Sequence, residues 1–108
     1  MFFVKMKDFQ EKVNVFCKRN QIDSPIEHRT LDIMAELGEL SKEILKVTNY
    51  GRMSFRGNEK VKVELGDVFF SIITLANKLD IDLSEALDIV LKKYEKRLIK
   101  CSPGSEND

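Results

Sequence analysis

Four acidic residues stand in two pairs of identical spacing, and this is the pattern in the sequence best suited to chemistry. Glu36 and Glu39 are three residues apart, as are Glu64 and Asp67. Residues three apart share one face of a helix, so each pair would present two carboxylates together. Carboxylate oxygens suit Mg²⁺ or Mn²⁺, with water and substrate phosphates completing the coordination shell. The spacing therefore suggests a divalent-metal site that handles phosphates.

Four helices and no strand are expected to position these acids. Apolar residues recur at helical spacing over about 5–20, 25–47, 59–79 and 82–99. Ser24 is predicted as the N-cap of the second helix, with Pro25 at its first position and Glu27 closing a capping box. Asp82 is predicted to start the fourth helix in a similar way. That helix is expected to turn an apolar face inward, made of Leu83, Leu87, Val90, Leu91, Tyr94 and Leu98.

In the two central helices, acids stand one residue before the members of an apolar stripe. At 3.6 residues per turn, this offset places the acids roughly 90° to one side of the stripe. If the two stripes face each other in an antiparallel pair, both rows of acids emerge on the same side. The loop over 48–58 permits that arrangement. The stripes are Ile33, Leu37, Leu40, Ile44 and Val47, then Val61, Leu65, Val68, Ile72, Leu75 and Leu79.

Convergence of these acids would cost energy unless a cation fills the space between them. The alternative is that they are the solvated edges of ordinary amphipathic helices. Gly38 and Gly66 each stand between the two acids of a pair. Either a backbone or ligand approaches closely there, or the glycines simply allow the helices to pack.

Composition narrows the class of protein. The chain has 108 residues, 18 basic and 18 acidic, for a formal net charge of zero. We expect one domain over 1–100 with a polar, disordered tail over 101–108. The balanced charge argues against nucleic-acid binding, and no apolar run is long enough to span a membrane. The absence of a signal peptide predicts a cytoplasmic protein, and the small core makes oligomerisation plausible.

The two acidic pairs and their neighbours resemble the MazG-like, all-α nucleoside triphosphate pyrophosphohydrolases. Glu-x-x-Glu, the 24 residues over 40–63, and Glu-x-x-Asp match that family's signature. The words AELGELSKEI and VELGDVFFSIITLANKLDIDLSEAL resemble its two metal-binding helices. The resemblance spans roughly 24–98 and implies an oligomeric four-helix bundle, acting as a homodimer or homotetramer. It also implies Mg²⁺-dependent cleavage of an NTP or dNTP to the monophosphate and pyrophosphate.

The resemblance implies roles for individual residues. Glu36, Glu39, Glu64 and Asp67 would be the metal ligands, and Glu39 and Glu43 are candidates to accept the proton of the attacking water. Asn77 matches a polar position near substrate. The family's usual Lys and Asn on the last helix align with Val90 and Tyr94, so other cations would have to hold the phosphates. The candidates for this are Lys93, Arg97, Arg52, Arg56 and Lys60.

Two other functions fit the same residues. One is a phosphoribosyl-ATP pyrophosphohydrolase, a related helical enzyme with the same acidic design. The other is a non-catalytic helical dimerisation module, whose acids only keep it soluble. The base and the sugar of the substrate are not predicted by the sequence.

Overall fold

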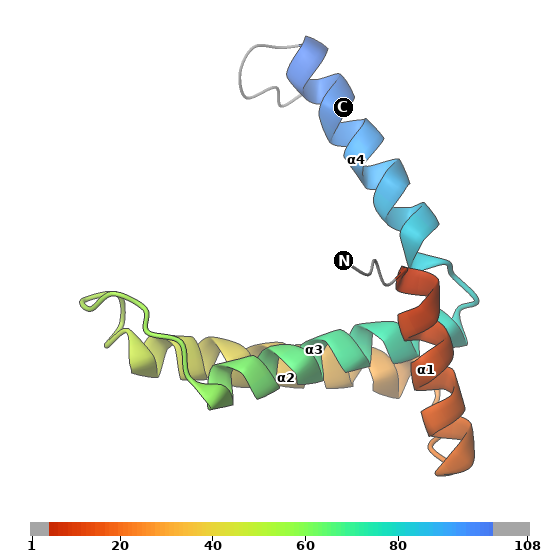
Figure 1. Ribbon diagram of the computed structural model, residues 1–108, viewed down its shortest axis with the longest axis horizontal. Helices are drawn as coiled ribbons and strands as arrows, with labels where there is room; N and C mark the ends of the chain where they lie inside the picture. Colours follow the sequence, from red (N-terminus) through yellow and green to blue (C-terminus); the bar gives the residue numbers. More distant parts are fainter. Residues whose placement is uncertain (1–4, 101–108) are drawn as a thin grey trace.

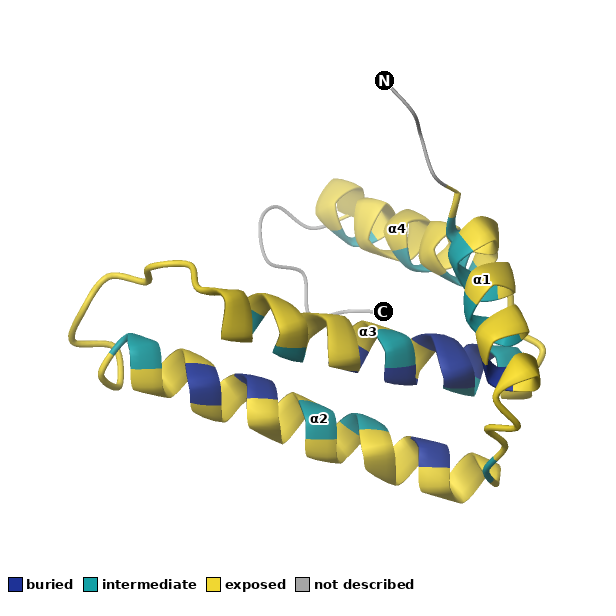
Figure 2. Cartoon of the chain, turned by 60° about the horizontal axis from the view of Figure 1, so that its bottom comes forward, coloured by how far each residue is buried: buried dark blue, intermediate teal, exposed yellow. Residues whose placement is uncertain are grey.

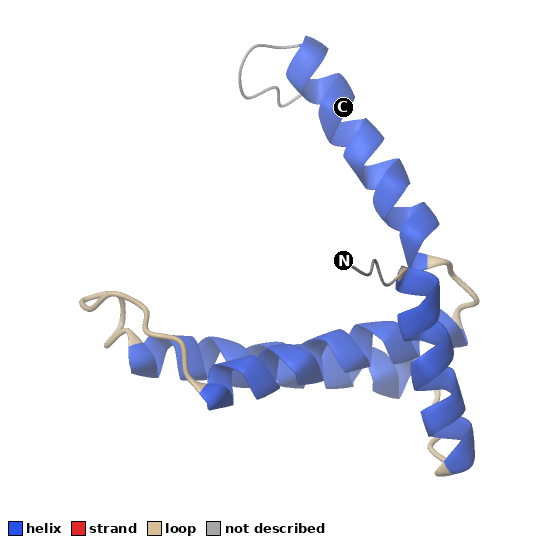
Figure 3. Ribbon diagram, viewed as in Figure 1, coloured by secondary structure: helices blue, strands red, loops and turns tan. Residues whose placement is uncertain are grey.

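The computed structural model describes residues 5–100, which form helices and contain no β-strand (Figures 1 and 3). The predicted all-α, four-helix class is confirmed. Within the described part, no helix combines the length and apolar character needed to cross a membrane. The predicted tail over 101–108 lies outside the described residues, so the domain division stays a prediction. The helices are α1 (Met6–Arg19), α2 (Ile26–Val47), α3 (Glu59–Lys78) and α4 (Leu83–Lys100).

The two longest helices, α2 and α3, lie side by side as an antiparallel hairpin (Figure 2). Helix α1 crosses one end of this hairpin and packs on α3 (Figure 1). Aromatic rings join them edge to face, with centroids 5.5 Å apart for Phe9 and Phe69 and 6.1 Å apart for Phe16 and Phe70. Ile73, only 2% exposed, is the most buried side chain of this small core. The small core therefore includes the region where α1 meets α3 and extends to Leu40 of α2 and Val68 of α3.

The helix ends show which local predictions were right. Asp82 caps α4 as predicted, because its carboxylate accepts a hydrogen bond of 2.9 Å from the Ser84 N–H. The prediction for α2 was wrong, since Pro25 is the N-cap and no side chain bonds to the free N–H groups there. Helix α3 has a cap that was not predicted: Asn58 Oδ1 accepts from the Val61 N–H at 2.7 Å.

The turn between α3 and α4 closes without glycine. Asp80 adopts a left-handed conformation with φ 57°. The Ile81 N–H then donates to the Ala76 carbonyl at 2.9 Å, which is the Schellman pattern that usually places glycine at this position. Aspartate is one of the few residues that enters this region readily. The turn directs α4 away from the hairpin (Figure 1).

The prediction that α4 turns an apolar face inward is wrong for a single chain. No α4 residue is buried, and Leu87, Leu91 and Leu98 are 53%, 53% and 68% exposed. The helix contacts α1 near its start and otherwise extends from the rest of the molecule (Figures 1 and 2). Its periodicity is real, but the described chain offers no surface to cover it.

We predict that Asn58→Ala lowers the free energy of unfolding by about 1 kcal/mol, because it leaves an N-terminal N–H of α3 without an acceptor. Urea denaturation followed by circular dichroism would measure the change. Ser24→Ala is the matched control, since Ser24 does not cap α2, and its effect should lie within measurement error. Equal losses in both variants would contradict this assignment of the caps.

Candidate metal centre

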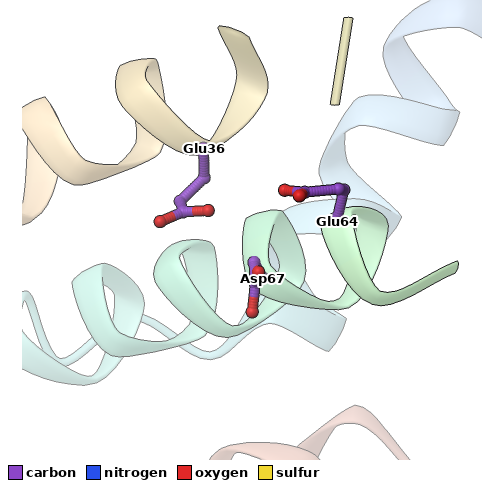
Figure 4. A group of neighbouring side chains, drawn as sticks. All are labelled: Glu36, Glu64 and Asp67. Atoms are coloured by element: carbon purple, nitrogen blue, oxygen red, sulfur yellow. The ribbon is translucent and has the colours of Figure 1, made fainter. Parts of the chain in front are cut away.

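Three carboxylates converge near the middle of the α2–α3 hairpin. Each of Glu36, Glu64 and Asp67 offers an oxygen, and these oxygens lie within 4.8 Å of one another. Glu36 points from α2 toward α3, which carries the other two (Figure 4). Glu36 and Glu64 are half-buried and Asp67 is exposed, so the group opens to solvent on one side. The structure therefore brings together three of the four acids predicted to converge.

The route to this convergence differs from the predicted one. The apolar stripes do not face each other squarely, because Leu37, Leu65 and Ile72 are exposed. The least exposed residues of α2 are Ile33, Leu40 and Val47 of the predicted stripe, together with Arg29, Glu36 and Glu43. Going along the helix from Arg29, the residues seven and fourteen positions on are Glu36 and Glu43, which share nearly one angular position. The acids thus line the helix interface instead of standing roughly 90° to its side.

Glu39, the fourth predicted ligand, is not part of this group. It is exposed, and one step of three residues turns it about 60° from Glu36 on the α2 surface. It is still close enough to act electrostatically. Partial burial raises the pKa of Glu36, and repulsion from Asp67, Glu64, Glu39 and Asp32 raises it further, in that order of importance. Like charges therefore crowd around Glu36, and a cation would relieve this.

The donor set fits a hard divalent cation. Carboxylate oxygens suit Mg²⁺ and Mn²⁺, and Mg²⁺ usually keeps several of its waters beside a few protein ligands. Three carboxylates with one open side match that preference. Among the described residues, the group includes no cysteine or histidine. Its ligands therefore favour an oxygen-preferring metal over zinc.

Glu43, a predicted proton acceptor, is engaged elsewhere. It is 7% exposed and lies 3.5 Å from the Lys60 ammonium, joining α2 to the start of α3. Lys60, a predicted substrate contact, is the other member of that ion pair. The pair holds the loop end of the hairpin together. Of the two predicted proton acceptors, Glu39 is the one that remains open to solvent.

The other predicted substrate contacts are spread over the molecule. Arg52 and Arg56 are exposed in the loop over 48–58. Lys93 and Arg97 lie on α4, where their charges stand over the Tyr94 ring at 5.1 and 5.3 Å from its centroid. Because α4 extends away from the hairpin (Figure 1), the structure does not bring them to the three carboxylates. Their predicted roles stay predictions.

Asn77 has a clear structural partner. Its side-chain NH₂ donates to the Gln10 carbonyl and its oxygen accepts from the Gln10 amide, both at 3.0 Å. Gln10 also bonds the Ile81 carbonyl at 2.8 Å and the Leu83 N–H at 2.9 Å. The Asn77–Gln10 pair thus fixes α1 against α3 and the start of α4. A contact between Asn77 and substrate stays a prediction.

The glycines between the acids are not packed against a neighbouring helix. A Cβ built on Gly38 or Gly66 would meet nothing within 4 Å. Close packing within one chain therefore does not require either glycine, and their surfaces are open to a ligand or another molecule.

Arg29 is a buried charged residue that was not predicted from the sequence. Its spacing of seven from Glu36 was the available signal.

Comparison with known proteins identifies a matching family. Residues 26–102 match the MazG nucleotide pyrophosphohydrolase domain family. The chain is 42% identical over 65 residues to YpjD of Bacillus subtilis (strain 168), a match that spans 57% of each protein. The aligned part therefore covers little more than half of that curated relative.

Two solved structures are similar over most of the chain. One is a Bacillus-conserved MazG protein, described as a nucleotide pyrophosphohydrolase; it has a TM-score of 0.74 and 32% identity, with 87% of this chain and 93% of that chain covered. The other is YpjD from Bacillus subtilis, proposed to be a pyrophosphatase; it has a TM-score of 0.72 and 34% identity, with 90% and 99% covered.

We predict that Glu36→Gln raises the free energy of unfolding at pH 7 in the presence of a metal chelator. Because the folded-state pKa of Glu36 is raised, its ionisation disfavours the native state, and the wild type loses stability as pH rises through that pKa. A gain of about 0.5 kcal/mol is expected at pH 7, vanishing in acid, where the wild-type carboxyl is protonated. Urea titrations across pH would measure it.

Glu27→Gln is the control on the same helix. Glu27 lies in the first turn of α2, where a negative charge interacts favourably with the helix dipole, so its neutralisation should give no gain. A Glu36→Gln variant that is less stable than the wild type at pH 7 would contradict the proposed crowding of charge.

Proposed function

The chain belongs to the MazG nucleotide pyrophosphohydrolase domain family, and from that premise we propose that it hydrolyses a nucleoside or deoxynucleoside triphosphate to the monophosphate and pyrophosphate. The observation that carries the proposal is the convergence of Glu36, Glu64 and Asp67 at the centre of the hairpin. A group of like charges with an open side is suited to hold Mg²⁺ against a polyanionic substrate.

The chain's own residues would divide the work as follows. Glu36, Glu64 and Asp67 would hold the metal, and their placement on two packed helices fixes its position. When bound, Mg²⁺ (or Mn²⁺) supplies charge neutralisation for the triphosphate and activation of water. Glu39 lies beside the group with its carboxylate in solvent, where it could complete the ligand set or accept the proton of the attacking water.

Water attack would break the anhydride bond between the α- and β-phosphates. The oxygen of the water would become part of the monophosphate, and pyrophosphate would leave. The proton released from the water would pass to a carboxylate such as Glu39. Exposed cations of the hairpin loop, Arg52 and Arg56, are in a position to attract the triphosphate by long-range charge. The remaining predicted cations, Lys93 and Arg97, would need α4 of another subunit to reach the site.

We also propose that the working protein is a homodimer or a homotetramer. The apolar residues on α4 and on the outer faces of α2 and α3 form extensive exposed surface, including Leu31 at 66%, Met34 at 67% and Leu98 at 68%. Exposed apolar area on this scale marks an interaction surface. A second copy carries matching apolar helices, which supports a symmetric interface.

We predict that Asp67→Asn and Glu64→Gln each lower the rate of pyrophosphate release by at least about a hundredfold. Residues that merely support metal ligands cost ten- to a hundredfold when changed, so a ligand itself should cost no less. The assay would follow pyrophosphate from all NTPs and dNTPs with Mg²⁺, and phosphoribosyl-ATP beside them. Glu59→Gln, an exposed acid in the first turn of α3, is the control and should keep wild-type turnover.

Several outcomes would overturn this proposal. Stepwise release of orthophosphate would exclude cleavage at the α–β bond, and wild-type rates in both variants would exclude the three-carboxylate site. A preference for phosphoribosyl-ATP would favour the related enzyme of that substrate. Absence of both turnover and thermal stabilisation by Mg²⁺ or Mn²⁺ would favour a non-catalytic module, since metal binding to the native state must raise its stability.

We predict that Leu91→Glu combined with Leu98→Glu reduces the mass of the assembly in solution. Both side chains stand on the apolar face of α4, more than half exposed, so the charges would be buried in the proposed interface at high cost. Light scattering coupled to size exclusion would measure the mass. Lys96→Glu, on the opposite side of α4, is the control. A monomeric wild type would contradict the proposal.

A further inference from the structure

A cavity lined by both apolar and charged side chains lies at the end of the hairpin where α1 crosses it. It has a volume of about 480 Å³ and is lined by α1, the turn after α1, the start of α2 and the end of α3. None of the three clustered carboxylates lines it. The lining residues that matter for its charge are Lys18, Asp23, Arg29 and Lys78.

These charges leave the cavity with an excess of positive groups. Three of the four are cations, and the fourth, Asp23, already binds the Lys78 ammonium at 2.8 Å. That hydrogen bond, with the charge of Lys78 and a smaller effect of Arg29, lowers the pKa of Asp23. Asp23 is itself largely exposed, with 79% of its side chain accessible. Its carboxylate therefore offsets mainly the charge of Lys78, and the four groups together keep a net positive charge.

Arg29 is the unusual member of this lining. It is 7% exposed, and its Nε is buried with no hydrogen-bond partner among the described residues. An arginine cannot shed its charge, and a buried donor without an acceptor costs stability. Burial of charged groups is normally compensated by a partner. Arg29 therefore lines a cavity whose other charged groups are mostly cations, and it keeps one buried donor without an acceptor.

We propose that this cavity binds an oxyanion, a phosphate or carboxylate group, with Arg29 as its central donor and Lys18 and Lys78 as flanking charges. The Nε–H and an adjacent Nη–H of arginine form the planar fork that matches two oxygens of such a group. A bound oxyanion would neutralise the excess charge, and a small rotation of the guanidinium toward it would give the buried Nε an acceptor. The proposal does not depend on the proposed hydrolysis.

The cavity is placed to serve either of two sources of that anion. Arg29 stands seven residues before Glu36, and the lining residue Thr74 stands seven after Asp67. On both helices this places the cavity about 10 Å along the axis from the carboxylates, on nearly the same face. The oxyanion can be a free small molecule, or an anionic group carried by a substrate whose triphosphate lies at the carboxylates.

The test is a titration of the full chain with inorganic phosphate, in a chelator and at constant ionic strength, followed by NMR of arginine Nε–Hε groups. The Arg29 signal, assigned by its loss in Arg29→Lys, should move in a saturable way. The Arg29→Lys variant keeps the positive charge but loses the planar fork of donors, so it should bind phosphate about tenfold more weakly. Binding to this variant would be followed by the backbone amide signals of residues around the cavity. Arg19→Lys, an exposed arginine at the end of α1 that does not line the cavity, should bind phosphate like the wild type.

Two further experiments distinguish the two sources of the anion, and distinguish this proposal from the proposed hydrolysis. Competition between phosphate and a non-hydrolysable nucleotide with Mg²⁺ would assign the anion to the substrate, whereas simultaneous binding would assign it to a separate small molecule. Glu36→Gln should lose turnover but keep phosphate binding, so failure of the hydrolase proposal is distinguishable. An unmoved Arg29 signal, the same shift with chloride, or equal affinity in Arg29→Lys would overturn the proposal.

Discussion

The repulsion among acids between α2 and α3 is the constraint on which the rest of this molecule depends. Two antiparallel helices pack with Glu36, Glu43 and Glu64 turned toward their interface, where a soluble hairpin would ordinarily place apolar side chains. Glu43 is neutralised by Lys60. Near Glu36 no such partner is found among residues 5–100, and the pKa of its carboxyl is raised. The fold thus holds negative charge where a cation would be the natural complement.

Turning the acids inward has a consequence for the apolar residues. The stripes of α2 and α3 rotate partly outward, so that Leu37 and Leu65 are exposed beside the open surfaces of Gly38 and Gly66. Helix α4 has the same property along its whole length, with no buried residue. The described part of a single chain therefore has a small core, made of Cys17, Leu40, Val68, Ile73 and Ala76. The hydrophobic surface that remains is what a small domain would use to gain stability by association.

Local features of this fold could be predicted from the sequence, whereas the surfaces that cover each helix could not. Periodicity located all four helices to within a residue or two, and Asp82 was identified as a cap because its side chain acts within its own turn. The Ser24 cap failed because the adjacent Pro25 took the N-cap position. Such competition between neighbours depends on backbone geometry, which residue types alone do not specify.

The candidate site could also be predicted in part, because it depends on spacing within each helix, whereas the way in which the helices face each other could not. Spacing placed Glu36, Glu64 and Asp67 within reach of one another, because i and i+3 positions share a helix face whatever packs on it. Glu39 did not join them, because α2 turns Glu36 toward α3 and leaves Glu39 exposed. The apolar stripe alone did not predict this orientation of α2. A stripe shows which side of a helix is covered in the working protein, but not by which molecule. The burial of Arg29 was not predicted for a similar reason, since it depends on how α2 packs against its neighbours.

The zero net charge of the chain conceals an ordered separation of charge along one face of the hairpin. Acids occupy its middle. Two turns toward α1 stands the buried Arg29, and two turns toward the loop stands the Glu43–Lys60 pair, followed by the loop cations Arg52 and Arg56. A polyanion alone would be repelled at the centre and attracted at both ends. A metal held at the centre reverses the repulsion, so the same face then attracts a polyanion along its whole length. Balanced composition is therefore compatible with an anionic ligand, provided that the carboxylates hold a cation first.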